Sequence, residues 1–296
     1  MAFDKSKLPD LDHVVVSALE LFCKQRLPNL ELPEFKRPLV VGSGNAALTA
    51  KILLHGRDAI LADESTFEER LDSTPGIDGA VLVSASGGKH APVIAKELKK
   101  RNVWTILLTN NPQAPAAPLV NKTYVFPKQP EPYTYNTSTY LGMILSRTKE
   151  EPKRILDHIR KLKIPKDLGD YSAFFLLVPE RFELERPMLL TKFDELFGPM
   201  VSGRAFTLEQ AKHAKTVVES DKELFISFGE KNRLFGTKRL DVPLPKNADY
   251  GAMLATGYYV IGKIQAQRPP YYKDSIEAYC RKSSKVFGED IQPMVG

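Results

Sequence analysis

Hydroxyl side chains and glycines gather in one short stretch of the chain, residues 84–90. An apolar run at 81–83 precedes this stretch, and residues 91–100, with apolar side chains at helical spacing, follow it. The first amide groups of a helix have no partners within the helix and attract anions. The pattern therefore predicts a strand, a phosphate-binding loop and a helix. The predicted phosphate ligands are Ser84, Ala85, Ser86 and Lys89, and His90 could be a further contact.

Two other stretches have a similar character. Residues 42–45 stand between an apolar run and an expected helix, and residues 134–139 precede another expected helix. Glycine lets a backbone approach a ligand, and hydroxyl groups donate to oxyanions. Loops that follow parallel strands converge at one edge of the sheet. These stretches add the predicted ligands Gly42, Ser43, Gly44, Asn45, Asn136, Thr137 and Ser138.

An alternative stays open for each stretch. Any one of them alone could be an ordinary turn with a capping serine, and Lys89 could equally be a solvated surface lysine. Three such loops in one sheet favour an anion pocket. Neither glycine stretch matches the dinucleotide-binding or Walker patterns.

Composition narrows the classes of function. The chain has 296 residues, 43% of them hydrophobic, which favours two globular domains. A formal charge of +6 favours anionic ligands, but the basic residues are dispersed, which argues against nucleic acid. No apolar run approaches a membrane span, and Cys23 and Cys280 stand far apart, so a cytoplasmic protein without disulfides is expected. The histidines lack metal-ligand spacing, so no metal is expected.

Strand and helix patterns alternate along both halves of the chain. This alternation predicts an α/β fold with two doubly wound domains, each a parallel sheet flanked by helices. The expected organisation is an N-terminal helix within 1–36, a first domain at 37–148, a linker helix at 149–170 and a second domain at 171–296.

The loops resemble those of a known group, the sugar isomerase (SIS) domain proteins. Ser84-Ala85-Ser86-Gly87 resembles their Ser-x-Ser-Gly phosphate loop, and Gly42-Ser43 resembles their first glycine-serine loop. The resemblance covers about residues 38–146. The family commonly has Ser or Thr where this chain has Lys89.

The resemblance implies a tandem-SIS phosphosugar isomerase similar to phosphoglucose/phosphomannose isomerases and to the isomerase domain of glucosamine-6-phosphate synthase. It implies aldose–ketose isomerisation, or a related deglycation or deamination, of a sugar 6-phosphate by a homodimer without a cofactor. The alternative is a non-catalytic sugar-phosphate sensor.

The same resemblance assigns the proton-transfer roles. Glu195 would be the base and His213 the residue that assists ring opening, although the interval between them is two residues longer than is usual in the family. Glu209 is the substitute base. Glu195 could equally be a solvated helix carboxylate, and His213 could be a structural histidine. A C-terminal lysine acts in several family members, but Lys282 and Lys285 do not match well enough to assign that role.

Overall fold

The computed structural model describes residues 4–295 and divides them into two compact units. The first unit contains Lys24–Lys128 and Thr139–Lys149. The second unit contains 4–23, Gln129–Ser138 and 150–295.

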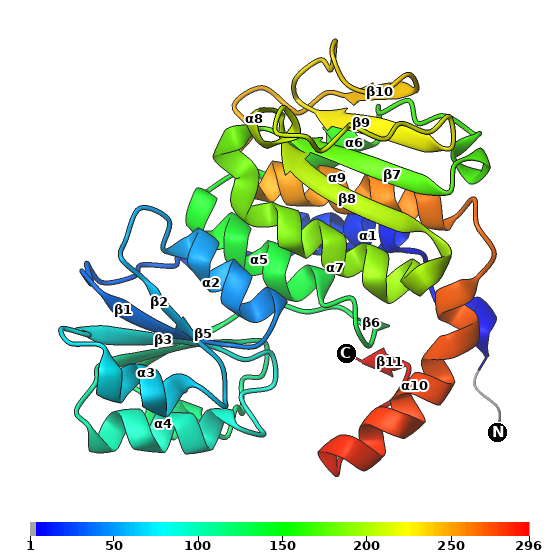
Figure 1. The fold of residues 1–296 in the computed structure, drawn as a ribbon. Coiled ribbons are helices and arrows are strands. Elements are labelled where there is room, and N and C mark those ends of the chain that lie inside the picture. Colours follow the sequence, from blue (N-terminus) through cyan, green and yellow to red (C-terminus); the bar gives the residue numbers. More distant parts are fainter. Residues whose placement is uncertain (1–3, 296) are drawn as a thin grey trace. The chain divides into compact units, whose positions relative to one another are not determined.

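The first unit is built on a five-stranded parallel sheet (Figure 1). The strand order is β2-β1-β3-β4-β5, with bounds β1 (Pro38–Val41), β2 (Ile60–Ala62), β3 (Gly79–Val83), β4 (Thr105–Thr109) and β5 (Lys122–Val125). The helices of this unit are α2 (Asn45–Leu53), α3 (Phe67–Ser73), α4 (Ala91–Lys100), the short 3-10 turn Ala117–Leu119 and most of α5 (Thr137–Thr148).

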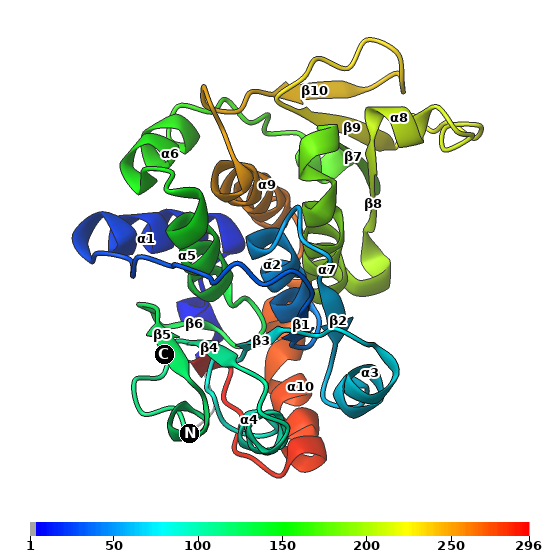
Figure 2. The same ribbon diagram turned by 90° about the vertical axis from the view of Figure 1, so that its left-hand side faces the viewer.

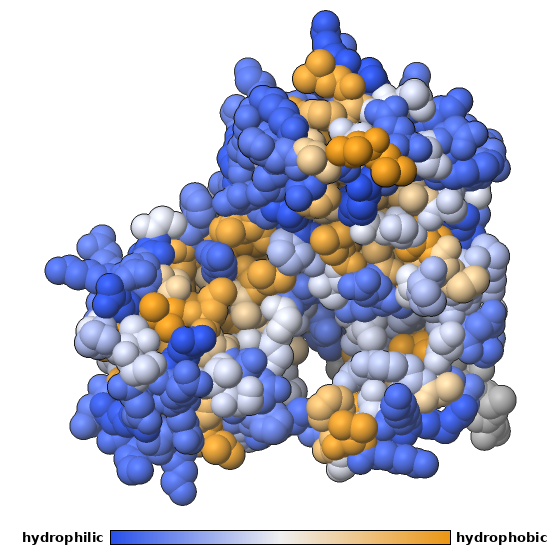
Figure 3. Space-filling model, in the orientation of Figure 1, coloured by the Kyte–Doolittle hydropathy of each residue, from blue (hydrophilic) through white to orange (hydrophobic). Residues whose placement is uncertain are grey.

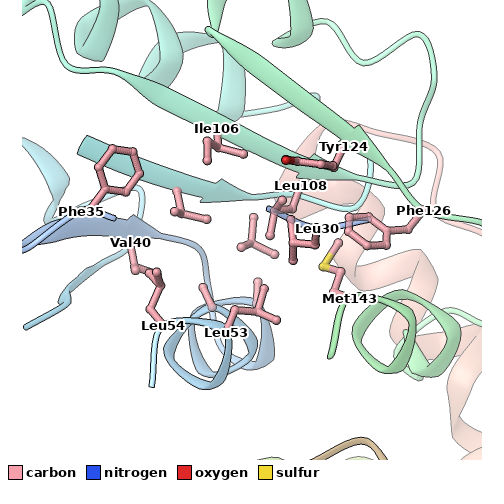
Figure 4. Packing of buried hydrophobic residues seen from close by; sticks show 14 residues of the cluster. Leu30, Phe35, Val40, Leu53, Leu54, Ile106, Leu108, Tyr124, Phe126 and Met143 are labelled. Carbon is pink, nitrogen blue, oxygen red and sulfur yellow. The ribbon is translucent and has the colours of Figure 1, made fainter. Parts of the chain in front are cut away.

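Apolar side chains cover both faces of this sheet. One face buries Val40, Val81 and Ile106 against Leu53 of α2 and Met143 of α5, as Figure 4 shows in part. The opposite face carries the alternate residues of the same strands and packs against α3 and α4. A parallel strand with both faces buried reads as a continuous apolar run, which is why these central strands were readable from the sequence.

The second unit has a four-stranded parallel sheet with the order β10-β9-β7-β8 (Figures 1 and 2). Its strands are β7 (Ala173–Val178), β8 (Ser202–Thr207), β9 (Glu223–Phe228) and β10 (Arg239–Val242). Its helices are α1 (Leu11–Lys24), α6 (Pro152–Ile159), α7 (Arg186–Phe197), α8 (Leu208–Ala211), α9 (Tyr250–Gln265) and α10 (Tyr271–Phe287), with 3-10 segments at Lys5–Lys7, Leu168–Asp170, Glu180–Glu185 and Gly198–Met200. A small antiparallel pair joins β6 (Glu131–Pro132) to β11 (Met294–Val295).

The expected fold class is confirmed, because both sheets are parallel and flanked by helices. The two units differ from the expected boundaries, because 4–23, 129–138 and the expected linker from residue 150 on belong to the second unit, and 24–36 belongs to the first. Residues 4–23 group with the second unit because the Leu11 amide donates to Gln265 Oε1 at 2.9 Å and Asp12 forms an ion pair with Lys263 at 2.7 Å. Gln129–Ser138 groups there because β6 pairs with β11.

The expected linker helix at 149–170 is shorter in the structure. Only α6 and a 3-10 turn at Leu168–Asp170 are helical in that interval. Pro165 lies between them, and a proline disfavours helical backbone at the residue before it, here Ile164.

No helix within residues 4–295 is both long enough and apolar enough to span a membrane. Figure 3 shows polar side chains interspersed with several apolar patches on one face. Val286 and Phe287, at the C-terminal end of α10, are among the exposed apolar residues.

Candidate functional site

The loop at 84–90 lies in the first unit, between β3 and α4. The Gly87 amide donates to Ser84 Oγ at 3.2 Å, and the Gly88 amide donates to Ser86 Oγ at 3.2 Å. Both serine oxygens therefore act as acceptors within the loop. Because a hydroxyl has one donor hydrogen as well, Ser84 and Ser86 retain O–H groups that can donate to an oxyanion.

The neighbouring loop after β4 fixes this loop from behind. Thr109 Oγ1 donates to the Ala85 carbonyl at 2.9 Å, and the side-chain amide of Asn111 donates to the Ser86 carbonyl at 3.0 Å. Gly87 has φ +62°, and a Cβ built on it would lie 2.4 Å from Ala114 Cβ. Only glycine fits this position without displacing its neighbour, so the loop is held in one shape before any ligand arrives.

Lys89 and His90 follow at the start of α4, and both side chains are exposed. Lys89 has φ +51°, a left-handed conformation that is uncommon for lysine. The exposed ammonium group stands next in sequence to a loop that presents hydroxyl donors, so its charge adds to the attraction for an anion.

The loop at 42–45 is less suited to an anion. Ser43 Oγ donates its hydrogen to the Glu64 carboxylate, which places a negative charge beside this loop. Gly44 adopts φ +53° before α2, and Asn45 is buried in the first turn of that helix. A phosphate would have to displace Glu64 before it could accept a hydrogen bond from Ser43.

The start of α5 already holds a carboxylate. Glu131 is fully buried, and its Oε2 accepts from the Thr137 amide at 2.8 Å, while its Oε1 accepts from Ser138 Oγ at 2.8 Å. Asn136 precedes them with φ +46°. The position that an anion takes at a helix N-terminus is thus filled by the protein itself. The Thr137 amide and the Ser138 hydroxyl already donate to Glu131, and the Thr137 hydroxyl, which has no partner among the described residues, is buried.

A buried ion pair lies on α7 in the second unit. The Lys192 side chain is 0% exposed, and its Nζ donates to Glu195 Oε2 at 2.6 Å. The same Nζ donates to the Thr134 carbonyl at 3.2 Å and to the Tyr135 carbonyl at 2.9 Å. Residues three apart in a helix share one face, and Tyr135 and Tyr258 present their rings to this ammonium group. All three N–H groups of Lys192 have acceptors, so its buried charge is compensated.

Burial raises the pKa of the Glu195 carboxyl, and the Lys192 ammonium opposes that rise. The neighbouring Asp194 adds a small further rise. A partly desolvated carboxylate is a stronger base than one in solution, while the adjacent cation favours its ionised form and fixes its direction. Glu195 therefore has the properties of a general base.

A cavity of about 670 Å³ lies in the second unit, and Glu195 forms part of its wall. Thr134, Tyr272 and Tyr279 line it as well. Thr134 Oγ1 lies 3.3 Å from the Tyr272 hydroxyl, and burial raises the pKa of Tyr272 well above its usual value. The Tyr272 hydroxyl is therefore a neutral group that can donate to a ligand.

The other predicted proton-transfer residues lie elsewhere. His213 follows the short helix α8, its side chain is exposed, and it is not among the described residues that line the cavity. Glu209 is also exposed and pairs with Lys212. Lys282 and Lys285 are exposed on α10.

Sequence reasoning missed the part played by Lys192. The Lys-x-x-Glu spacing was visible in the sequence, but a lysine is normally solvated, and nothing in the pattern showed that this one is buried. The contribution of Thr134 and Tyr272 to the cavity was also missed. These two residues reach the cavity from segments far apart in the chain, and a local pattern does not show that they meet.

One group of possible metal ligands occurs within residues 4–295, formed by Asp10, Asp12 and His13. Lys273 pairs with Asp10 at 2.9 Å and Lys263 pairs with Asp12 at 2.7 Å. These ammonium groups already balance both carboxylates, so the cluster is accounted for without an ion.

No family model and no curated protein matches the chain, whereas solved structures do. The C-terminal domain of glucosamine-fructose-6-phosphate aminotransferase from Francisella tularensis aligns over 93% of this chain and 99% of its own, with TM-score 0.61 and 14% identity. Tagatose-6-phosphate ketose/aldose isomerase from Escherichia coli aligns over 89% of each chain, with TM-score 0.56 and 12% identity. Glucosamine-6-phosphate deaminase from Thermotoga maritima aligns over 87% of this chain and 91% of its own, with TM-score 0.54 and 17% identity.

These alignments span most of every chain compared, including both parallel sheets of this one. At identities of 12–17%, these structural alignments show that the fold is shared, but they do not identify the reaction, which depends on the residues of the site. The resemblance first suggested by the loops at 42–45 and 84–88 is confirmed at that level: the chain has the fold of the sugar isomerase (SIS) domain proteins.

Proposed function

We propose that this protein isomerises a sugar 6-phosphate between its aldose and ketose forms without a cofactor. The observation that carries the proposal is the Glu195 carboxylate, which is largely desolvated, held by Lys192 and placed in the wall of a cavity. The fold supports it, since proteins of this fold include a ketose/aldose isomerase and a deaminase of sugar phosphates. Deglycation or deamination of a sugar phosphate would use the same base.

Phosphate capture is assigned to the loop at 84–90. Ser84 and Ser86 retain hydroxyl donors, and the loop is fixed by Thr109 and Asn111. This preorganisation means that binding does not have to order the loop. The stretches at 42–45 and 136–138 contribute less in this proposal, because the Ser43 hydroxyl already donates to Glu64, and the Thr137 amide and the Ser138 hydroxyl already donate to Glu131.

Glu195 acts on the carbon skeleton of the open-chain sugar. Its carboxylate removes the proton from C2 of the aldose, the electron pair of that C–H bond forms the C1–C2 double bond, and the carbonyl oxygen at C1 is protonated. The resulting enediol gives the ketose when the proton returns from Glu195 to C1, while the C2 hydroxyl loses its proton and becomes the new carbonyl group. Such a positioned base contributes about 10²–10⁴-fold to the rate.

The resemblance to the SIS family is the only basis for assigning ring opening to His213. The same resemblance is the basis for proposing a homodimer. His213 is exposed in the single chain. The variant His213→Asn should lower turnover of a ring-closed sugar phosphate more than turnover of an analogue that cannot cyclise. Light scattering in solution tests the dimer, and a monomer at micromolar concentration would contradict that part of the proposal.

A thermal-shift screen followed by an isomerase assay tests the function. Hexose, aminosugar and pentose phosphates are compared, and at least one should raise the melting temperature and be converted. The double variant Ser84→Ala with Ser86→Ala should lose that stabilisation, whereas Ser17→Ala, which removes an exposed hydroxyl from α1, should keep it. If the double variant binds as tightly as the wild type, the loop does not hold the phosphate.

A sugar-phosphate sensor is the second candidate. The observation that favours it is the exposed His213, which leaves the cavity without an imidazole among the described lining residues. A sensor would be stabilised by a sugar phosphate in the same screen and would convert none of the panel.

A further inference from the structure

The cavity in the second unit has a lining that is unusual for a phosphate site. Aromatic residues form much of its wall, namely Phe197, Tyr271, Tyr272 and Tyr279. Carboxylates supply the charge, and no lysine, arginine or histidine is among the described lining residues. A phosphate group entering this cavity would meet like charge, so the part of a ligand that lies here is neutral or positive.

The three carboxylates in the lining differ in how far they are already neutralised. Glu195 is paired with Lys192 at 2.6 Å, and Asp274 is paired with Lys5 at 3.3 Å. Asp194 forms no ion pair with a described residue, and its side chain is exposed. Asp194 is therefore the carboxylate whose charge remains available to a cationic ligand.

Tyrosine rings beside an uncompensated carboxylate recognise an ammonium group. The face of an aromatic ring carries negative potential and attracts a cation within about 6 Å of its centre. The volume of about 670 Å³ lies inside the range of cavities that hold small organic ligands. Met200, which is 56% exposed, and the buried Ile276 add apolar contact for the body of such a ligand.

From these features we infer that the cavity binds a small organic ammonium ion, with the cationic nitrogen at Asp194 and the apolar body against the tyrosines. This site goes beyond the proposed isomerase function, because every lining residue belongs to the second unit and no phosphate is needed for binding. The ligand would lie next to Glu195, so its occupancy would also govern access to that carboxylate.

Three probes of nearly equal size separate charge from shape: benzylamine, benzyl alcohol and benzoate. Each is titrated at millimolar concentrations into protein that carries ¹³C in its methionine methyl groups, without any sugar phosphate. The Met200 methyl signal, assigned with the variant Met200→Leu, reports on the cavity. The buried methionines Met143, Met188 and Met253 serve as internal references.

Benzylamine should shift the Met200 signal in a saturable way, benzyl alcohol should bind roughly three- to tenfold more weakly, and benzoate should bind least. Asp194→Asn should weaken benzylamine by a similar factor, since an exposed carboxylate is worth about that much. The matched control Glu219→Gln removes an exposed carboxylate that does not line the cavity and should bind benzylamine as the wild type does.

Equal binding of benzylamine and benzyl alcohol would overturn the inference, because the cavity would then select shape without charge. An absence of any Met200 shift with benzylamine, or unchanged benzylamine binding by Asp194→Asn, would overturn it as well. None of these results depends on turnover. Failure of the isomerase proposal and failure of this inference are therefore separate observations.

Discussion

The Lys192–Glu195 pair combines two opposing influences on one carboxyl group. Burial favours the protonated form of Glu195, and the ammonium group of Lys192 favours the ionised form. Burial is the larger influence, so the pKa is raised, and the cation limits that rise. Two carbonyl oxygens hold Lys192 in place, so its distance to Glu195 is fixed by the segment at 134–135.

Lys192→Met should raise the pKa of Glu195 further, because it removes the cation and keeps the burial. Glu195 would then be protonated over a wider pH range and could not act as a base there. The acid limb of the kcat/KM profile should move to higher pH, by about one unit or more for a cation so close. A ¹³C titration of the Glu195 carboxyl, assigned with Glu195→Gln, measures the same shift without activity. Lys212→Met, which removes an exposed partner of Glu209, is the control, and an unmoved limb in Lys192→Met would refute the coupling.

A fully buried carboxyl group without hydrogen-bond partners in residues 4–295, that of Glu185, should make stability depend on pH. Glu185 is fully buried, its oxygens have no hydrogen-bond partner among the described residues, and burial raises its pKa well above 4.5, with Glu150 and Asp249 adding to the rise. The folded state therefore keeps a proton that the unfolded chain releases. The stabilisation from Glu185 is complete below its unfolded pKa and is lost as the pH rises toward its folded pKa, at up to about 1.4 kcal/mol per pH unit.

Glu185→Gln should remove this dependence. Its free energy of unfolding should match the wild type near pH 4 and exceed it increasingly toward neutral pH, as measured by urea denaturation at several pH values. Glu219→Gln, at an exposed position, should follow the wild type throughout. A constant difference between Glu185→Gln and the wild type across the pH range would show that Glu185 does not titrate as described.

At the scale of elements, the buried parts of the fold were the predictable ones. The helix α4 has the bounds that its apolar pattern indicates. The strands β8 and β10 lack a clear strand pattern because they stand at the two edges of their sheet, and β8 carries glycine, arginine and serine instead of an apolar run. An edge strand buries less of its surface, so its sequence has less of the pattern that identifies a strand.

The predicted loops follow strands in the structure, but the residue types alone could not show which of their hydrogen-bond donors are free to bind an anion. The Thr137 amide and the Ser138 hydroxyl are suitable donors, yet the carboxylate of Glu131, six and seven residues away, already accepts from them. Ser43 likewise donates to Glu64, which is 21 residues distant. Such partners depend on the folded path of the chain, and no local pattern records them.

The loop at 84–90 should depend on Gly87 for its shape. Gly87→Ala would place a Cβ 2.4 Å from Ala114 Cβ at φ +62°, so we expect a loss of about 1–3 kcal/mol in stability and weaker phosphate binding. Gly88→Ala is the matched control, because its Cβ would meet only Ser86 Oγ at 3.5 Å. Thermal denaturation and phosphate titration compare the two variants, and equal tolerance of both would show that the loop is not fixed at Gly87.

For the whole molecule, the fold class was predictable because alternating strands and helices admit few arrangements. The assignment of chain segments to the two units could not be predicted from the sequence. The second unit recruits α1 and β6 from distant parts of the chain through Gln265, Lys263 and the pairing with β11. Contacts over more than a hundred residues leave no trace in local periodicity.

Separate fragments should show this interdependence. A fragment of residues 24–149 holds the first sheet and both of its apolar faces, so we expect cooperative unfolding and dispersed amide signals in NMR. A fragment of residues 150–296 lacks α1 and β6 and should remain poorly ordered until residues 4–23 and 129–138 are restored. A fully folded 150–296 fragment would contradict the grouping of these segments.

The most direct test of the central claim is exchange of the C2 proton of a bound sugar phosphate with deuterium in D₂O, followed by NMR. The wild-type protein should catalyse this exchange, and Glu195→Gln should slow it by about 100-fold or more while sugar-phosphate binding persists. Exchange by Glu195→Gln at the wild-type rate would show that Glu195 is not the base.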